Sequence, residues 1–206
     1  MFKVLSLISL IFCFCLFSHS INAQGKQSYW TLRGGYLRSF VTASEPTIPS
    51  PNLYQSLGLS PINSYYVGVA YVQKWSKLGF SLGLNLQRKG MKGIDISQTA
   101  RTVPNNDYYY GNFSPLIHYS FSKNAYIQLG PEVNFLLTKN SAFAYSKPVE
   151  IGGIVRLGYA INRIDFQVGV SHGFTPYSVS KFTGKDVFVL RNTTLQVGIA
   201  YKVKSL

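Results

Sequence analysis

Charge is scarce in this sequence, and so are long apolar runs. Only 13% of its 206 residues are charged, about half of the roughly 25% that is usual for a soluble domain. Aromatic residues make up 15%. A disordered chain is poor in aromatics and rich in charge, so this composition excludes one. Beyond the first 20 positions, no apolar run approaches the roughly 18 residues of a membrane-spanning helix, which excludes a helical membrane protein.

Cysteine is nearly absent, and both copies lie in an N-terminal export signal. Lys3 is followed by an apolar run at residues 4–17, and the segment ends at the small residue Ala23. This order predicts a signal peptide at residues 1–23 and a single domain at 24–206. Phenylalanines precede Cys13 and Cys15, where lipid attachment would need a small residue. The exported chain therefore has no disulfide and no thiolate for catalysis or metal binding.

What the sequence does have is alternation. In segment 78–89 the even positions are Leu, Phe, Leu, Leu, Leu and Arg, and the odd ones are Gly, Ser, Gly, Asn, Gln and Lys. Period 2 is typical of a strand with one apolar face. The same pattern predicts eight strands, at residues 29–41, 65–75, 78–89, 108–121, 125–137, 149–161, 164–176 and 187–203. No stretch shows helical periodicity.

The connections between these strands alternate in length. Short turns are expected near 76–77, 122–124 and 162–163, and long loops near 42–64, 90–107, 138–148 and 177–186. An even number of strands of about 10 residues with this alternation is typical of outer-membrane barrels. We therefore predict an all-β fold, an eight-stranded antiparallel up-and-down transmembrane β-barrel. Its short turns and both termini would lie in the periplasm of a Gram-negative cell.

A soluble eight-stranded barrel of the lipocalin kind is the competing architecture. Its outer face would meet water and carry many Lys and Glu residues. Here the less apolar face consists of Gly, Ser, Asn, Gln and Thr, which suits a crowded interior and leaves the Leu, Val and Phe face for lipid. Aromatic residues near the strand ends predict interfacial girdles. They are Tyr29, Trp30, Trp75, Tyr108, Tyr109, Phe121, Tyr159, Phe174 and Tyr201.

Four stretches resemble the PorT-like outer-membrane β-barrel family. They are 84–90 (LNLQRKG), 110–116 (YGNFSPL), 129–132 (LGPE) and 195–201 (LQVGIAY). The resemblance implies an eight-stranded outer-membrane barrel, and it implies no reaction. Since the family's name-giving member is linked to protein secretion, the resemblance also implies a possible secretion-system or periplasmic protein partner.

Three charges are expected inside the barrel. Glu132 and Arg156 lie midway along consecutive strands, and parity places both side chains in the lumen. Arg33, midway along the first strand, can join them across the narrow interior. Because a buried charge needs a partner, we expect a lumen charge pair. It is either a plug that fills the barrel or part of a gated polar path.

The histidines do not indicate catalysis. Outer-membrane lipid A hydrolases use a His/Ser pair, and Ser171 and His172 invite that comparison. Adjacent strand residues face opposite sides, so Ser171 cannot serve His172. His118 is expected at the other end of the barrel, so the two histidines cannot share a ligand set. We predict no enzyme, no metal and no cofactor, with a lipid-acting enzyme as the less favoured alternative.

The basic excess, with 20 Lys and Arg against 7 Asp and Glu, gathers at the two rims. Cations expected near the periplasmic end are Lys26, Lys74, Lys77, Lys123, Arg163, Lys202 and Lys204. Either these cations provide solubility and contact phospholipid headgroups, or they bind an anionic periplasmic partner. An exported chain without a recognition motif excludes nucleic acid.

Three arginines are expected on the lipid face near the outer rim, namely Arg38, Arg88 and Arg191. Arg binds phosphate in bidentate fashion, which makes the phosphates of lipopolysaccharide their expected contact. Simple snorkelling to water is the alternative. The function that follows is a non-enzymatic outer-membrane protein, acting as a structural or interaction protein through its loops and rims.

Overall fold

The computed structural model describes residues 26–44, 60–92, 95–96, 101–102, 106–140, 147–182 and 185–203. The predicted signal peptide at 1–23 lies outside these residues. Among the residues described, no helix is long and apolar enough to cross a membrane. The strands are β1 (Lys26–Ser44), β2 (Ser60–Trp75), β3 (Leu78–Lys92), β4 (Asp95–Ile96), β5 (Arg101–Thr102), β6 (Asn106–Ser120), β7 (Ala125–Asn140), β8 (Val149–Ile161), β9 (Ile164–Gly173), β10 (Ser178–Phe182) and β11 (Lys185–Lys202).

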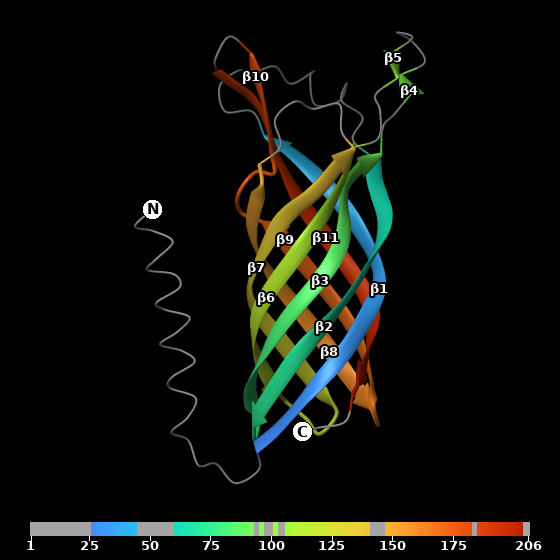
Figure 1. Ribbon diagram of the computed structural model, residues 1–206, viewed down its shortest axis with the longest axis vertical. Helices are drawn as coiled ribbons and strands as arrows, with labels where there is room; N and C mark the ends of the chain where they lie inside the picture. Colours follow the sequence, from blue (N-terminus) through green and yellow to red (C-terminus); the bar gives the residue numbers. More distant parts are fainter. Residues whose placement is uncertain are drawn as a thin grey trace.

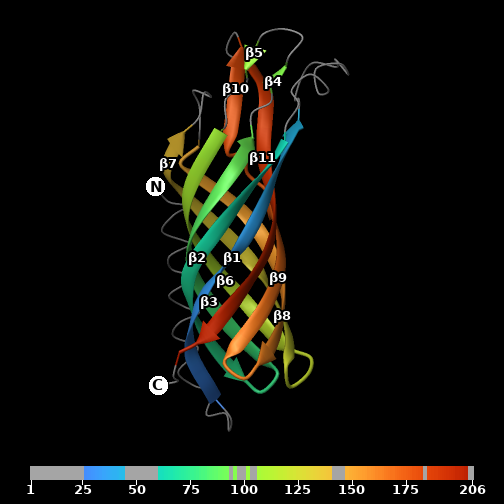
Figure 2. The ribbon, with the colours of Figure 1, turned by 90° about the vertical axis from the view of Figure 1, so that its right-hand side faces the viewer.

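The strands close into a barrel. β1, β2, β3, β6, β7, β8, β9 and β11 pair in that order, and β11 pairs back with β1. Every pairing is antiparallel, and the closing one runs from Thr31 opposite Lys202 to Ser44 opposite Val189. Figures 1 and 2 show the tilted strands around the barrel axis. The predicted eight-stranded antiparallel up-and-down barrel is confirmed.

The short connections lie at one end of the barrel, together with the start of β1 and the end of β11 (Figure 1). The β2–β3 and β8–β9 turns each have two residues, and Ser76 and Asn162 adopt positive φ angles of 59° and 55° there. Positive φ suits the tight hairpins that match strand twist. At the other end, β10 pairs with β11, and the hairpin that these two strands form extends beyond the barrel (Figure 2). The last long connection therefore contains a strand that was expected to be loop.

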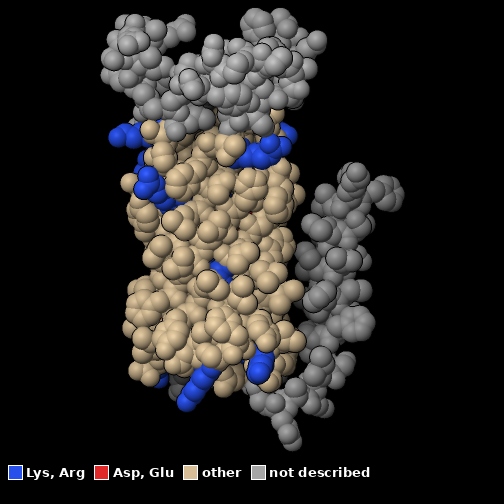
Figure 3. Space-filling view, turned by 180° about the vertical axis from the view of Figure 1, so that it is seen from behind, with Lys and Arg blue, Asp and Glu red and all other residues tan. Residues whose placement is uncertain are grey.

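Side chains alternate between two environments. Outward positions carry exposed apolar residues on every wall strand, for example Leu84, Val155, Phe166 and Ile199. Inward positions are mostly polar and buried. In Figure 3 the Lys and Arg side chains of the visible face gather near the two ends, with a broad uncharged belt and one small basic patch between them. An apolar belt between two charged rims is the surface that a bilayer solvates.

The aromatic girdle differs in part from the expectation. Trp30, Phe121, Tyr159 and Phe174 are exposed on the outer face as expected. Tyr108, in contrast, is completely buried in a lumen cluster at the loop end of the barrel. The cluster consists of Met91, Tyr108, Tyr110, Tyr177 and Leu190. Strand parity, and not position near a strand end, decides whether an aromatic ring meets lipid.

Candidate functional site

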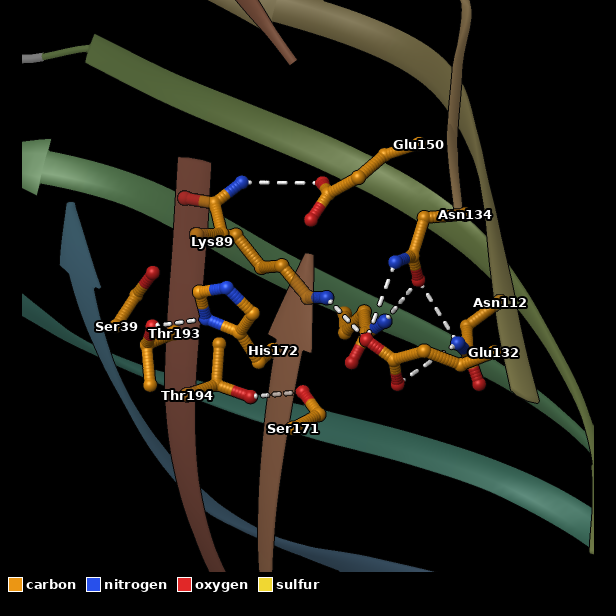
Figure 4. Close-up of polar contacts among 12 residues, drawn as sticks. Ser39, Lys89, Asn112, Glu132, Asn134, Glu150, Ser171, His172, Thr193 and Thr194 are labelled. Atoms are coloured by element: carbon orange, nitrogen blue, oxygen red, sulfur yellow. Dashed lines mark hydrogen bonds and ion pairs between the residues drawn. The ribbon is translucent and has the colours of Figure 1, made fainter. Parts of the chain in front are cut away.

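The centre of the lumen network is a buried ion pair. Lys89 on β3 places its Nζ 2.9 Å from Oε1 of Glu132 on β7, and both side chains are almost fully buried. Asn134 Nδ2 donates to the same carboxylate at 3.2 Å, and Asn112 Nδ2 donates to its other oxygen at 3.4 Å. Figure 4 shows the three donors converging on Glu132. The carboxylate is held by one charged and two neutral partners, as a buried charge requires.

The network continues through amide side chains toward β1. Asn112 also donates to Asn134 Oδ1 at 2.8 Å, and Asn85 donates to Asn112 Oδ1 at 2.7 Å. Arg33 Nε then donates to Asn85 Oδ1 at 2.7 Å, and its Nη2 to Ser114 Oγ at 3.3 Å. Side chains from β1, β3, β6 and β7 are thereby joined across the interior.

A second polar group lies nearer the short-turn end. Arg156 on β8 donates from Nη1 to Gln128 Oε1 at 3.2 Å. The amide nitrogen of Gln128 lies 3.2 Å from Nδ1 of His118, whose ring stacks on Tyr126 with centroids 4.5 Å apart. The Tyr126 hydroxyl donates to Asp165 at 3.2 Å. His118 is thus enclosed by polar and aromatic neighbours and is almost fully buried.

The structure places Glu132, Arg156 and Arg33 inside the barrel, but it does not pair Glu132 with Arg156. Arg156 lies opposite Gln128 in the β7–β8 register, and Glu132 lies opposite Gly152. Four residues along a strand separate the two levels by about 13 Å. Among the described residues, Glu132 pairs with Lys89, and the two arginines are bonded to neutral oxygens instead of carboxylates.

Two charged residues in or beside the central network were missing from the predicted set, Lys89 and Glu150. Lys89 is at an inward position in the alternating pattern of its strand, so the sequence indicates that it faces the lumen. Its place at the end of the predicted strand gave no sign of how deeply it is buried. Glu150 on β8 is fully buried, and Asn192 on β11 donates to it at 3.1 Å. Figure 4 shows this second carboxylate beyond the Lys89–Glu132 pair.

Ser171 and His172 point to opposite sides of the wall. Ser171 is buried in the lumen, with its hydroxyl 2.6 Å from that of Thr194. His172 is exposed on the outer face, and its Nδ1 lies 2.8 Å from Thr193 Oγ1. The two side chains therefore form no nucleophile–base pair. Within the described part of the chain, no three His, Cys, Asp or Glu side chains gather as a metal site.

The three outer arginines differ in what they contact. Arg38 is exposed, and its guanidinium lies 5.5 Å from the centre of the Phe40 ring. Arg88 forms an ion pair with Asp107 at 2.7 Å. Arg191 donates from Nε to the Phe174 carbonyl at 3.3 Å.

The outer arginines of β1 and β11 do not lie at the same level. Arg38 lies opposite Leu195 on β11, whereas Arg191 lies opposite Thr42 on β1, so the two are four register positions apart. Arg38 is the most exposed of the three, since Arg88 and Arg191 are half-buried.

A closed antiparallel barrel, an apolar outer belt and a lumen lined by buried polar side chains together define a class of protein. The chain is a transmembrane β-barrel of the outer-membrane type. No protein-family model matches it. No protein of curated function matches it in sequence either.

Solved structures with a similar fold are bacterial outer-membrane barrels. OprG from Pseudomonas aeruginosa is 13% identical, with a TM-score of 0.48 over 89% of this chain and 99% of that one. Ail of Yersinia pestis, solved with the heparin analogue sucrose octasulfate, is 12% identical, with a TM-score of 0.47 over 86% and 99%. Neisserial surface protein A is 14% identical, with a TM-score of 0.47 over 87% and 100%. These likenesses concern the fold alone.

Proposed function

We propose that the chain is a non-enzymatic protein of the Gram-negative outer membrane that acts through its outer loops and rims, as a structural or interaction protein. The carrying observation is the network of buried side chains that crosses the lumen. The Lys89–Glu132 network crosses the interior, and the aromatic cluster with Tyr108 and Tyr177 lies above it at the loop end. An eight-stranded barrel has an interior just wide enough for its own side chains. No diffusion path for solutes is expected, so we place the function at the two ends of the barrel.

Planar-bilayer recording tests the filled lumen. We expect no stable single-channel conductance from the purified barrel, because hydrogen-bonded side chains occupy the space that ions would need. Replacing the cluster residues Tyr108 and Tyr177 with Ala should leave the barrel non-conducting, since the polar network beneath them remains. A steady ohmic conductance of the unaltered protein would contradict the proposal and favour a gated polar path.

Cysteine labelling tests the orientation. Ser180→Cys lies on β10 at the long-loop end, and Ser76→Cys lies in the β2–β3 turn at the other. The exported chain has no other cysteine if the predicted signal is removed. On intact cells a membrane-impermeant maleimide should label position 180 and not position 76. Labelling of position 76 alone would reverse the proposed orientation.

The outer arginines support lipopolysaccharide as a partner. A guanidinium costs about 2–4 kcal/mol at the bilayer midplane but only about 0–1 kcal/mol near the interface, where phosphates can bind it. We expect Arg38→Gln with Arg191→Gln to lower the lipopolysaccharide retained per purified barrel, measured by mass spectrometry. Arg88→Gln should have less effect because Asp107 already holds that guanidinium.

The control for the lipopolysaccharide experiment is at the other rim. Lys77→Gln with Lys123→Gln removes the same charge from exposed positions in the short turns. Retention should be unchanged in this variant. Equal losses in both double variants would show an effect of net charge and no phosphate site.

The resemblance to the PorT-like family favours a second candidate, a component of an outer-membrane secretion machinery. Support comes from the ordered motifs at 84–90, 110–116, 129–132 and 195–201. Mild detergent extraction of native membranes, followed by affinity capture of the full protein, tests it. Stoichiometric recovery of periplasmic or inner-membrane secretion proteins is the expected result for this role, and recovery of lipopolysaccharide alone would count against it.

A further inference from the structure

A pocket of about 490 Å³ lies at the short-turn end of the barrel, inside the ring of strands. Its lining comes from the start of β1, the end of β2, the β6–β7 and β8–β9 turns and the end of β11. Four cations contribute to it, Lys74, Lys123, Arg163 and Lys202. A volume in this range is typical of small-molecule sites and too small for a folded partner.

The charge in this pocket is poorly compensated. The carboxylate beneath it, Asp165, is already engaged by Lys202 Nζ at 2.9 Å and by the Tyr126 hydroxyl at 3.2 Å. Within the described residues, Lys74, Lys123 and Arg163 have no carboxylate at ion-pair distance. In this part of the chain, three cations without a carboxylate at ion-pair distance therefore line one concave site.

The scaffold fixes the positions of these cations. The backbone N–H of Ala160 donates to the Asn124 carbonyl at 2.7 Å, which joins the turn that carries Lys123 to the end of β8, just before the turn that carries Arg163. The Lys202 N–H donates to the Arg163 carbonyl at 2.8 Å. Lys74 lies over the Tyr126 ring, with its Nζ 5.5 Å from the ring centre. Because the backbone under these cations is held in place, only their side-chain ends have to be ordered when an anion binds, which lowers the entropic cost.

We propose that this periplasmic mouth is a binding site for a small, multiply charged anion of the phosphate type. Lysine ammonium groups bind phosphate as point charges, and Arg163 adds a planar fork of donors. The pocket lies inside the wall, between inward side chains such as Tyr29 and Tyr126, so its ligand enters along the barrel axis. That route favours a soluble periplasmic anion over the headgroup of a surrounding lipid.

That this mouth faces the periplasm rests on the orientation proposed above, whereas the presence of an anion site does not. Titration calorimetry with inorganic pyrophosphate in neutral detergent micelles is independent of orientation, so failure of the site and failure of the orientation are distinguishable. We expect saturable one-to-one binding. Lys123→Gln with Arg163→Gln should weaken it by about tenfold or more, because two charge-assisted contacts are lost.

Lys77→Gln is the matched control, since Lys77 is an exposed turn lysine at the same end that does not line the pocket. It should change pyrophosphate affinity by less than about twofold. Equal losses in both variants, or no saturable binding by the unaltered barrel, would overturn the proposal. In nanodiscs of equal surface charge, pyrophosphate should bind equally well whether the anionic lipid is phosphatidylglycerol or a carboxylate lipid without phosphate. Loss of binding in phosphatidylglycerol alone would instead assign the pocket to a lipid headgroup and overturn the soluble ligand.

Discussion

Glu132→Ala should lower the free energy of unfolding by about 3–5 kcal/mol, because it leaves the Lys89 ammonium buried without its partner. Lys89 is 1% exposed, so water cannot replace the lost carboxylate. The amides of Asn112 and Asn134 lose an acceptor in the same step. Urea unfolding in detergent micelles, followed by the fluorescence of lipid-facing Trp30, measures the change.

Removing both charges together should be much less harmful. In Lys89→Met with Glu132→Gln, the glutamine oxygen still accepts from Asn134, and neither member of the ion pair is left buried and charged without the other. Replacing a buried ion pair with neutral groups of similar volume is often close to neutral. The double-mutant cycle should therefore show a coupling energy well above the roughly 0.5 kcal/mol within which independent sites add.

A second cycle asks whether Arg156 is the partner instead. Arg156→Met combined with Glu132→Gln should show weak coupling, because the guanidinium bonds to Gln128 four register positions away. Strong coupling to Arg156 and none to Lys89 would show that the lumen pairs its charges as parity first suggested.

Parity predicted which side of the wall each lumen residue occupies, because the side-chain period of a strand is two whatever its neighbours do. Glu132, Arg156, Arg33 and His118 all face inward as alternation requires. The barrel itself followed from eight alternating segments joined by short and long connections in turn. Alternation and connection length are local features of the chain, so they can be read from a single sequence.

Which lumen side chains pair with one another depends on strand register and side-chain length, and the alternating pattern gives neither. The β6–β7 register shifts between Tyr109 and Tyr110, which changes the level at which Lys89 faces β7. A lysine side chain also spans several ångströms, so it reaches a carboxylate that is not opposite it. The pocket between Lys123 and Arg163 likewise depends on how two turns meet, since each of these cations alone resembles an ordinary surface charge.

The second large effect is expected at a glycine. Gly158 on β8 lies directly opposite Tyr126 on β7, and the tyrosine ring covers it. A Cβ atom at Gly158 would overlap the ring and its hydroxyl, so any larger residue must displace Tyr126. The displaced ring would lose its hydrogen bond to Asp165 and the one it accepts from Gln167 at 2.8 Å.

Gly158→Val should therefore destabilise the barrel by about 3–5 kcal/mol, from about 1–3 kcal/mol of overpacking and about 1 kcal/mol for each of two hydrogen bonds. Gly111→Val is the matched control, because a Cβ there meets only Leu137 at an ordinary 3.7 Å. It should change stability by less than about 1 kcal/mol, since scattered surface substitutions rarely exceed about 0.5 kcal/mol. Adding Tyr126→Leu to Gly158→Val removes the overlapping ring atoms, so the second substitution should cost less in that background than in the unaltered protein. Strict additivity of the two changes in urea unfolding would mean that Tyr126 does not rest on Gly158.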